Sequence, residues 1–270
     1  DPILFNTSFG MKSANSITTG YRNSAIGHQS LFSNTEGYYN SAVGFQSMYY
    51  NTTGNDNSSF GALSLISNTS GNRNNAFGVA TLSNNTTGND NVALGYYSMV
   101  SNTTGTENVA VGVSSLESNT TGNRNVATGY QVLYNNTWGF NNSAYGYKSL
   151  YSNSYGFNNT AVGNMSMYSN TTGYSNVAIG NGTLNKNTTG NFNIAIGSGT
   201  LANNTTGNDN IANGDYALGN NTTGINNVAI GKSSLHENVQ GNGNVACGFN
   251  TMKYNSNGSF NTIYGTEALH

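Results

Sequence analysis

Apolar residues recur along this chain in a fixed order with a period of 17 residues. Most repeats hold an alanine between two larger residues, as in Val92, Ala93 and Leu94, and a leucine or methionine follows shortly afterwards, as at Met99. A single period held over the whole chain indicates a solenoid, in which each repeat forms one coil that stacks on its neighbours.

Each repeat reads approximately G-Y-x-S-L-x-S-N-T-T-G-N-x-N-V-A-I. Helices are not expected, because the unit has two glycines and lacks an apolar stripe of 3.6-residue period. N-V-A-I-G, as in 91–95, predicts a strand, S-L-x-S predicts a second strand, and N-T-T-G predicts a turn whose glycine takes a positive φ. The predicted fold class is all-β: a single elongated β-solenoid (β-roll) with about 15 coils of 17 residues.

Glycine and asparagine follow the same period. Of the 35 glycines, 31 fall in a first series from Gly10 to Gly265 or a second series from Gly20 to Gly258, so they are placed by geometry and do not form flexible linkers. Asparagine fills a first row from Asn6 to Asn261 and a second row from Asn34 to Asn255. Coils stack about 4.8 Å apart, so we expect these side chains to form hydrogen-bonded ladders.

Two apolar rows are candidates for the core. The alanine row runs from Ala25 through Ala246, with Ser59 as an exception, and the leucine row runs from Leu31 to Leu269. The residues that flank each alanine face the other side of the strand. If alanine and leucine fill the interior, the flanking aliphatics form an outer apolar stripe, which predicts an oligomer. The inverse arrangement, with the aliphatics inside and the alanines outside, fits the pattern equally well.

Composition restricts the classes of partner. Only 7% of the residues are charged and the net charge is -2, which weighs against binding to nucleic acid or to acidic membranes. No apolar stretch approaches the roughly 20 residues of a membrane span, so membrane insertion is not predicted. The polar composition resembles that of a disordered tract, but the strict placement of the apolar residues argues against disorder.

We predict one domain over 1–270, with a degenerate N-terminal cap at 1–9 and regular repeats at 10–270. The cap holds Pro2, the only proline, and its apolar residues are suited to covering the first coil. The other end follows the regular phrase and stops within a repeat. We therefore expect either further chain after Leu269 or end-to-end stacking on another molecule.

No catalytic arrangement is predicted. The histidines, His28, His236 and His270, lie in distant coils, and the ten acidic residues are too scattered to nominate a pair of carboxylates. The G-K-S at 231–233 lacks the upstream glycine of a phosphate-binding loop, since Asn226 stands there. The sequence predicts neither enzymatic activity nor a cofactor or metal site.

One row carries alternating charge: Asp56, Arg73, Asp90, Glu107 and Arg124. We expect an exposed ladder of ion pairs there in preference to a cation site at Asp90 and Glu107.

Two further features have structural interpretations. The single cysteine, Cys247, takes a slot that Ile230 fills elsewhere, and it is predicted to be a small buried apolar residue. Glycosylation is not predicted at N-x-[ST] matches such as Asn51 and Asn170, because ladder rows would shield them.

Aromatic residues are concentrated in the middle repeats and form the candidate binding surface. At steps of 17 they make up three rows, continued by Tyr174: Tyr134, Trp138, Phe140, Tyr151, Tyr155, Phe157 and Tyr168. Rings stacked at strand spacing stabilise one another, so one interpretation is a packing ladder. The other is a contact surface for a glycan or protein, because planar rings suit the faces of sugars.

The N-V-A-I-G phrase resembles the S-V-A-I-G repeats in the head domains of trimeric autotransporter adhesins, whose shorter units form a left-handed β-roll assembled in threes. The segments YGYKSLYSNSYG (145–156) and AVGNMSMYSNTTG (161–173) resemble the N-T-A-x-G-Y-x-A-L-Y-S-N-T-T-G arrays of bacterial and phage tail-fibre-like proteins. Those arrays often precede a self-cleaving chaperone domain, which this chain does not contain. The resemblance implies a fibre or an adhesin.

The sequence thus predicts a non-enzymatic structural or adhesive fibre protein, extracellular or on a virion, that forms a homo-oligomer such as a trimer and binds a cell-surface glycan or protein. One alternative is a subunit of an extracellular filament stacked end to end. Another is an ice-binding solenoid, suggested by the regular row of Thr86, Thr103 and Thr120, although these threonines lie beside turn glycines.

Overall fold

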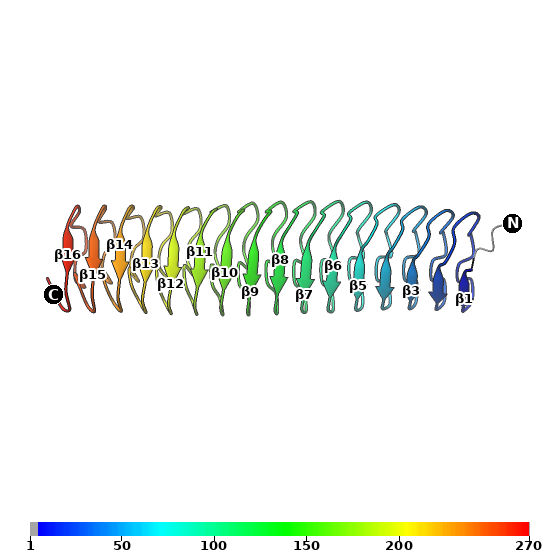
Figure 1. The fold of residues 1–270 in the computed structure, drawn as a ribbon, viewed down its shortest axis with the longest axis horizontal. Coiled ribbons are helices and arrows are strands. Elements are labelled where there is room, and N and C mark those ends of the chain that lie inside the picture. The colour runs from blue at the N-terminus through cyan, green and yellow to red at the C-terminus, as the bar shows by residue number, and fades with distance from the viewer. Residues whose placement is uncertain (1–4, 270) are drawn as a thin grey trace. The chain divides into compact units, whose positions relative to one another are not determined.

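The computed structural model describes residues 5–269, and it confirms the predicted fold class of an all-β solenoid. Within those residues there is no helix, and 16 parallel strands of three residues follow one another at intervals of 17 residues (Figure 1). The chain forms two compact units, unit 1 (residues 1–138) and unit 2 (residues 139–270), and each is described by itself.

In unit 1 each strand pairs in parallel with the next strand along the chain, so that Val92 lies beside Val109 and Ala93 beside Ala110. The strands are β1 (Thr7–Phe9), β2 (Ser24–Ile26), β3 (Ser41–Val43), β4 (Ser58–Phe60), β5 (Asn75–Phe77), β6 (Val92–Leu94), β7 (Val109–Val111) and β8 (Val126–Thr128).

Unit 2 repeats this arrangement, with Ile194 beside Ile211 and Ala195 beside Ala212. Its strands are β9 (Ser143–Tyr145), β10 (Thr160–Val162), β11 (Val177–Ile179), β12 (Ile194–Ile196), β13 (Ile211–Asn213), β14 (Val228–Ile230), β15 (Val245–Cys247) and β16 (Thr262–Tyr264).

The prediction of a second strand at S-L-x-S is wrong, because each coil holds one strand and this segment forms turns. The leucine row has left-handed backbone geometry, with φ of 51° at Met99 and 50° at Leu201, which a strand cannot contain. Left-handed geometry costs a non-glycine residue roughly 1–2 kcal/mol. Complete burial of a leucine side chain contributes about 1.5–3 kcal/mol, which offsets that cost.

The predicted role of the N-T-T-G glycine is also wrong. Positive φ occurs at the first glycine series, for example 137° at Gly95, and not at second-series glycines such as Gly88 and Gly207. The second series is needed for a different reason, since a Cβ on Gly207 would overlap Asn204 Oδ1 and the Gly224 carbonyl oxygen. Glycine is required at this turn because two coils meet there without room for a side chain.

The structure decides between the two arrangements of the strand residues. The alanine row and the leucine row are inside, and both Ala93 and Met99 are fully buried. The flanking residues face outward, with Val92 37% and Leu94 48% exposed. The prediction that the leucine row is buried is wrong at its last member, because Leu269 is exposed and no described coil covers it.

The predicted burial of Cys247 is wrong, because the residues that flank the alanine row face outward. It is the third residue of β15, so it occupies the outward position and is half-buried, beside Ile230 of β14.

Both asparagine rows form the predicted ladders. In the first row, Asn210 Nδ2 donates to Asn193 Oδ1 at 3.1 Å and to the Gly224 carbonyl at 2.9 Å, and Asn210 Oδ1 accepts from the Asn227 backbone N–H at 3.0 Å. In the second row, Asn204 Nδ2 donates to Asn187 Oδ1 at 2.8 Å. Every buried side-chain nitrogen and oxygen among the described residues has a hydrogen-bond partner.

The asparagines of the two N-x-[ST] matches also belong to the second row. Asn51 and Asn170 are fully buried, and each donates to the asparagine of the preceding coil, at 2.7 Å and 2.8 Å respectively.

Part of the predicted N-terminal cap is regular structure. Thr7–Phe9 form β1 and pair with β2, while Pro2 and the rest of residues 1–4 lie outside the described residues, as does His270. Because the chain is described as two units, the single domain over residues 1–270 stays a prediction.

We expect Asn210→Ala to destabilise the protein strongly. The change removes the partner of the Asn227 N–H and one of the two donors to the Gly224 carbonyl, which keeps its hydrogen bond from Asn221 Nδ2 at 3.0 Å. A buried polar group left without a partner costs about 1–3 kcal/mol. The midpoint of urea unfolding, followed by circular dichroism, should fall clearly, whereas Asn213→Ala on the exposed side of β13 should leave it nearly unchanged. Equal midpoints for the two variants would contradict the ladder's role.

Two glycine variants separate steric need from backbone freedom. Gly207→Ala places a Cβ against atoms of two coils. A Cβ on Gly182 would meet nothing within 4 Å, so the only cost of Gly182→Ala is that alanine must adopt the φ of 62° that Gly182 has. We expect Gly182→Ala to cost roughly 1–2 kcal/mol and Gly207→Ala to lower the melting temperature considerably more. A Gly207→Ala protein as stable as Gly182→Ala would show that the coils can move apart.

Candidate functional site

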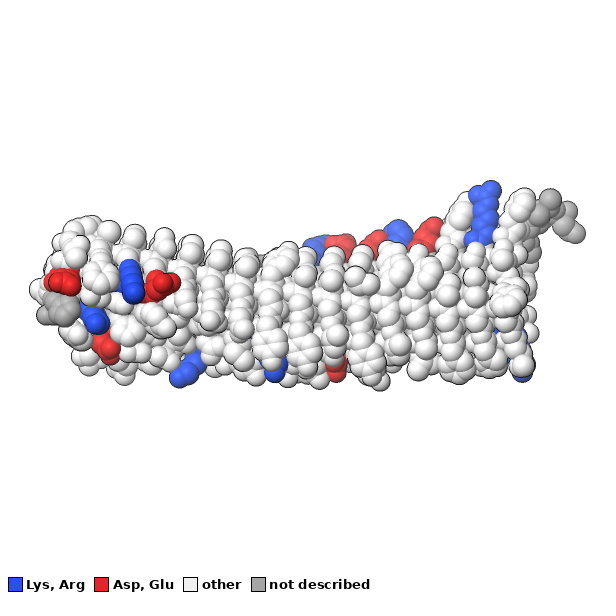
Figure 2. Space-filling model, turned by 90° about the horizontal axis from the view of Figure 1, so that it is seen from below, with Lys and Arg blue, Asp and Glu red and all other residues white. Residues whose placement is uncertain are grey.

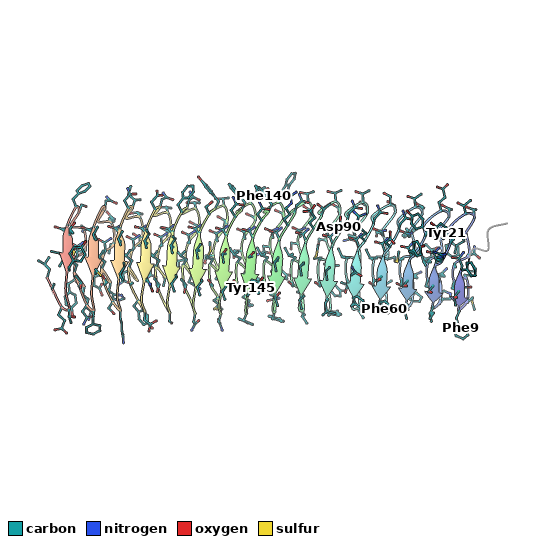
Figure 3. All side chains as sticks on the ribbon, viewed as in Figure 1. Phe9, Tyr21, Phe60, Asp90, Phe140 and Tyr145 are labelled. Atoms are coloured by element: carbon teal, nitrogen blue, oxygen red, sulfur yellow. The ribbon has the colours of Figure 1, made fainter. Side chains whose placement is uncertain are left out.

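The first aromatic ladder of unit 2 lies directly after the second glycine series. Phe140 and Phe157 stack with ring centroids 4.9 Å apart and planes inclined by 6°, and Phe157 stacks on Tyr174 at 4.7 Å and 3°. Phe140 lies at the turn that precedes β9 (Figure 3). This spacing is that of adjacent coils, so these three rings pack on one another as the ladder interpretation predicts.

A second ladder in unit 2 joins Tyr151 and Tyr168, whose rings stack at 5.1 Å and 7°. Lys148 Nζ lies 5.3 Å from the centroids of both Tyr147 and Tyr151, a cation–π arrangement. Desolvation lowers the pKa of Lys148, but hydrogen bonding to Tyr147 and the neighbouring tyrosines outweigh it, and the pKa is raised above its usual range. The ammonium therefore keeps its charge beside the rings.

The other predicted patch residues differ in their surroundings. Tyr155 in unit 2 is 57% exposed. Tyr134 and Trp138 belong to unit 1, where the Tyr134 hydroxyl donates to Glu117 Oε1 at 2.9 Å and Trp138 is 58% exposed. The structure thus brings together Phe140 with Phe157 and Tyr151 with Tyr168, and it gives Tyr155 and Trp138 the accessibility that ligand binding requires.

Aromatic ladders also occur in unit 1, outside the predicted binding surface. Stacked pairs one coil apart, at 4.9 to 5.6 Å, are Tyr21–Tyr38, His28–Phe45, Phe32–Tyr49 and Phe60–Phe77. Aromatic residues 17 positions apart are the signal that could have found them. Stacking is therefore general in this fold, which favours a packing role for the stacked rings of unit 2.

The charged row forms the predicted ion pairs in unit 1. Arg73 Nε lies 2.6 Å from Asp90 Oδ1, and Arg124 Nε lies 2.7 Å from Glu107 Oε2, with all four side chains exposed. The hydrogen bond from Arg73 lowers the pKa of Asp90, so this pair stabilises the fold above the unfolded pKa of Asp90 and is lost as the pH falls through the folded one. The exposure makes its contribution small.

Charge is otherwise sparse, as the face in Figure 2 shows. No group of three or more histidine, cysteine, aspartate or glutamate residues within residues 5–269 is arranged to hold a metal ion. His28 stacks on Phe45 in unit 1, whereas in unit 2 His236 Nδ1 lies 3.0 Å from the Tyr216 carbonyl oxygen and His236 Nε2 lies 3.6 Å from Glu237 Oε1. The two described histidines therefore belong to different units.

The threonine row proposed for ice binding takes part in the coil-to-coil bonding. Thr86 Oγ1 donates to the Thr103 carbonyl at 3.1 Å, and Thr103 Oγ1 donates to the Thr120 carbonyl at 3.0 Å. These hydroxyl hydrogens point along the stack, so the row is less suited to binding ordered water than a row of free hydroxyls would be.

Each unit has an apolar surface made of the first and third residues of its strands, here called the outer strand face. Phe60 on β4 and Tyr145 on β9 are examples (Figure 3). In strands β2 to β16 no charged residue occupies either position. The exposed aliphatic members are Ile26, Val92 and Leu94 in unit 1 and Val162, Ile179, Ile194, Ile196, Ile211 and Ile230 in unit 2.

Comparison with protein-family models, curated proteins and solved structures finds no match to this chain. Among residues 5–269, the structure contains no helix with the length and apolar character of a membrane span.

The two kinds of aromatic residue can be told apart by mutation. We expect Phe157→Ala to destabilise unit 2, because the ring stacks on neighbours on both sides and each such pair contributes about 0.5–1.5 kcal/mol beyond burial. Tyr155→Ala, at a largely exposed side chain, should leave the melting temperature almost unchanged. Equal losses in the two variants would contradict this distinction.

Proposed function

We propose that this chain is a non-enzymatic structural or adhesive fibre segment, extracellular or on a virion surface, that assembles with other copies of itself through the outer strand face. The observation that carries the proposal is the outward position of the aliphatic residues, with the alanine row fully buried behind them. Soluble monomers rarely leave an extended apolar surface uncovered.

The chemistry of the face favours another copy of the same chain as its occupant. It repeats once per coil and carries no charge in β2 to β16, so an identical face matches its spacing and needs no charged partner. Parallel pairing in register keeps the exposed side chains in straight rows within each unit. A trimer is the state that the resemblance to autotransporter heads implies.

The energetics require that many side chains be covered. Ile179, Ile196 and Ile230 are 38% to 43% exposed, so covering each recovers roughly 1 kcal/mol of the 1.5–3 kcal/mol for complete burial. Association costs about 4–15 kcal/mol, so roughly four to fifteen such residues, counted over both partners, must be covered. The six exposed aliphatic strand residues of unit 2, contributed by each of two copies, fall within that range.

The variant Ile179→Lys/Ile196→Lys tests this assembly. Two ammonium groups placed within the face cannot be buried against a second apolar surface without a large desolvation cost. We expect sedimentation equilibrium at micromolar concentration to show an oligomer for the unaltered chain and a monomer for the variant.

Thr189→Lys/Thr206→Lys is the matched control, because these exposed positions lie on the turn and another coil holds Tyr155 there. This control should retain the assembly. A monomeric unaltered chain, or an oligomer that survives the isoleucine changes, would refute the proposed contact.

A further inference from the structure

A shallow groove of about 400 Å³ lies on unit 2, outside the outer strand face. One wall is built by Lys186, Asn203, Asn220 and Glu237, which follow one another at steps of 17 residues and so belong to successive coils. Thr205 and Thr222, two residues further along the same coils, also line the groove and are called its second wall. The groove therefore runs along the stack of coils and not around one of them.

The first wall is a run of four successive coils without the residue that is commonest at this position. Serine is commonest in the other coils, as at Ser101, Ser118, Ser152 and Ser169, while asparagine stands singly at 84 and 135 and tyrosine at 50 and 254. Serine satisfies the coil geometry at those positions, so the larger polar side chains of the groove are not required by the solenoid. Four such changes in consecutive coils create a continuous polar wall.

The groove presents hydrogen-bonding groups in a regular order. Asn203 Nδ2 donates to Asn220 Oδ1 at 2.9 Å, and Asn220 Nδ2 donates to Glu237 Oε2 at 3.0 Å. Each amide has two N–H donors and a carbonyl acceptor, so these bonds use part of its capacity. On the other wall, the Thr205 hydroxyl donates to the Thr222 carbonyl at 3.0 Å, which leaves the hydroxyl oxygen to act as an acceptor.

The two ends of the first wall carry opposite charge. The Lys186 ammonium and the Glu237 carboxylate are three repeats apart, about 14 Å at the spacing of stacked strands. Between them the threonine methyl groups and Val239 add small apolar contacts beside the polar atoms. A ligand that fits must be extended, rich in hydroxyl groups, and negatively charged at one end.

We infer that this groove binds an acidic oligosaccharide of a few sugar residues, with its carboxylate at Lys186 and its hydroxyls on Asn203, Asn220 and Glu237. A sugar hydroxyl both donates and accepts, which matches amide and carboxylate neighbours, and the C–H faces of the ring suit the methyl groups. A peptide fits less well, because Val239 is the one apolar residue of the lining that could receive its side chains. The inference deepens the adhesive role proposed above and rests on it for its biological setting.

Titration calorimetry with maltotrionate, which carries one carboxylate at one end, tests the inference, with the neutral sugar maltotriose and the acidic peptide triglutamate as comparison probes. We expect the unaltered chain to bind maltotrionate most tightly. Asn203→Ser/Asn220→Ser should weaken that binding at least tenfold, and serine at these positions is compatible with the fold because Ser152 and Ser169 occupy the same row.

Lys186→Gln should remove the preference for maltotrionate over maltotriose, whereas Lys232→Gln, at an exposed lysine outside the groove lining, should change nothing. Circular dichroism melting establishes that each variant is folded. The inference is overturned by absence of maltotrionate binding at millimolar concentration, by binding that the groove variants do not alter, or by tighter binding of triglutamate. The oligomeric state, measured on the same samples, reports separately on the outer strand face.

Discussion

The hydrogen bonds that link one coil to the next through buried asparagine side chains are the interaction on which this structure depends. Each coil has only three strand residues, so most of its backbone cannot be satisfied by strand pairing alone. Backbone groups of adjacent coils also pair outside the strands, as the Leu218 N–H does with the Ser234 carbonyl at 2.9 Å. Asn210 supplies a partner that the backbone does not, since it accepts from the backbone N–H of Asn227 in the next coil, and it also donates to the carbonyl of Gly224. An inserted residue would displace that side chain from both partners, which explains why the period of 17 is held without variation.

The close approach of the coils follows from the same bonds and determines the glycines. The Asn204 amide and the Gly224 carbonyl occupy the space that a Cβ on Gly207 would need. The leucine row shows the complementary adjustment, because its residues accept left-handed φ values in return for complete burial. Local conformational preference is thus overridden wherever contact between coils contributes more free energy than the unfavourable backbone costs.

Periodicity identifies which residues are equivalent, and this made the solenoid, the asparagine ladders and the buried leucines predictable. It does not show which way an equivalent set points. The alternating S-L-x-S pattern is typical of a strand, but Leu201 has a φ of 50°, a value that depends on packing between coils and has no local sequence signal. Cys247 was predicted to be buried because the spacing alone does not show that its position on the strand faces outward. In the candidate site the stacking of Phe140 on Phe157 was predictable from their spacing, whereas the exposure of Tyr155 was not.

The rows divide into two classes with different freedom to change. Rows that point inward, such as the asparagine and alanine rows, are held nearly constant, because each member contacts its equivalents in adjacent coils. Rows that point outward tolerate almost any side chain, so one of them holds serine at 169, lysine at 186 and glutamate at 237. Equivalent side chains in successive coils lie next to one another at a fixed spacing. A few substitutions in neighbouring coils therefore produce a continuous line of side chains along the stack, such as a ladder of rings, a line of ion pairs or a groove. Recognition in a fold of this kind therefore depends on a run of neighbouring coils and not on a single loop, and any ligand must match the spacing of the coils.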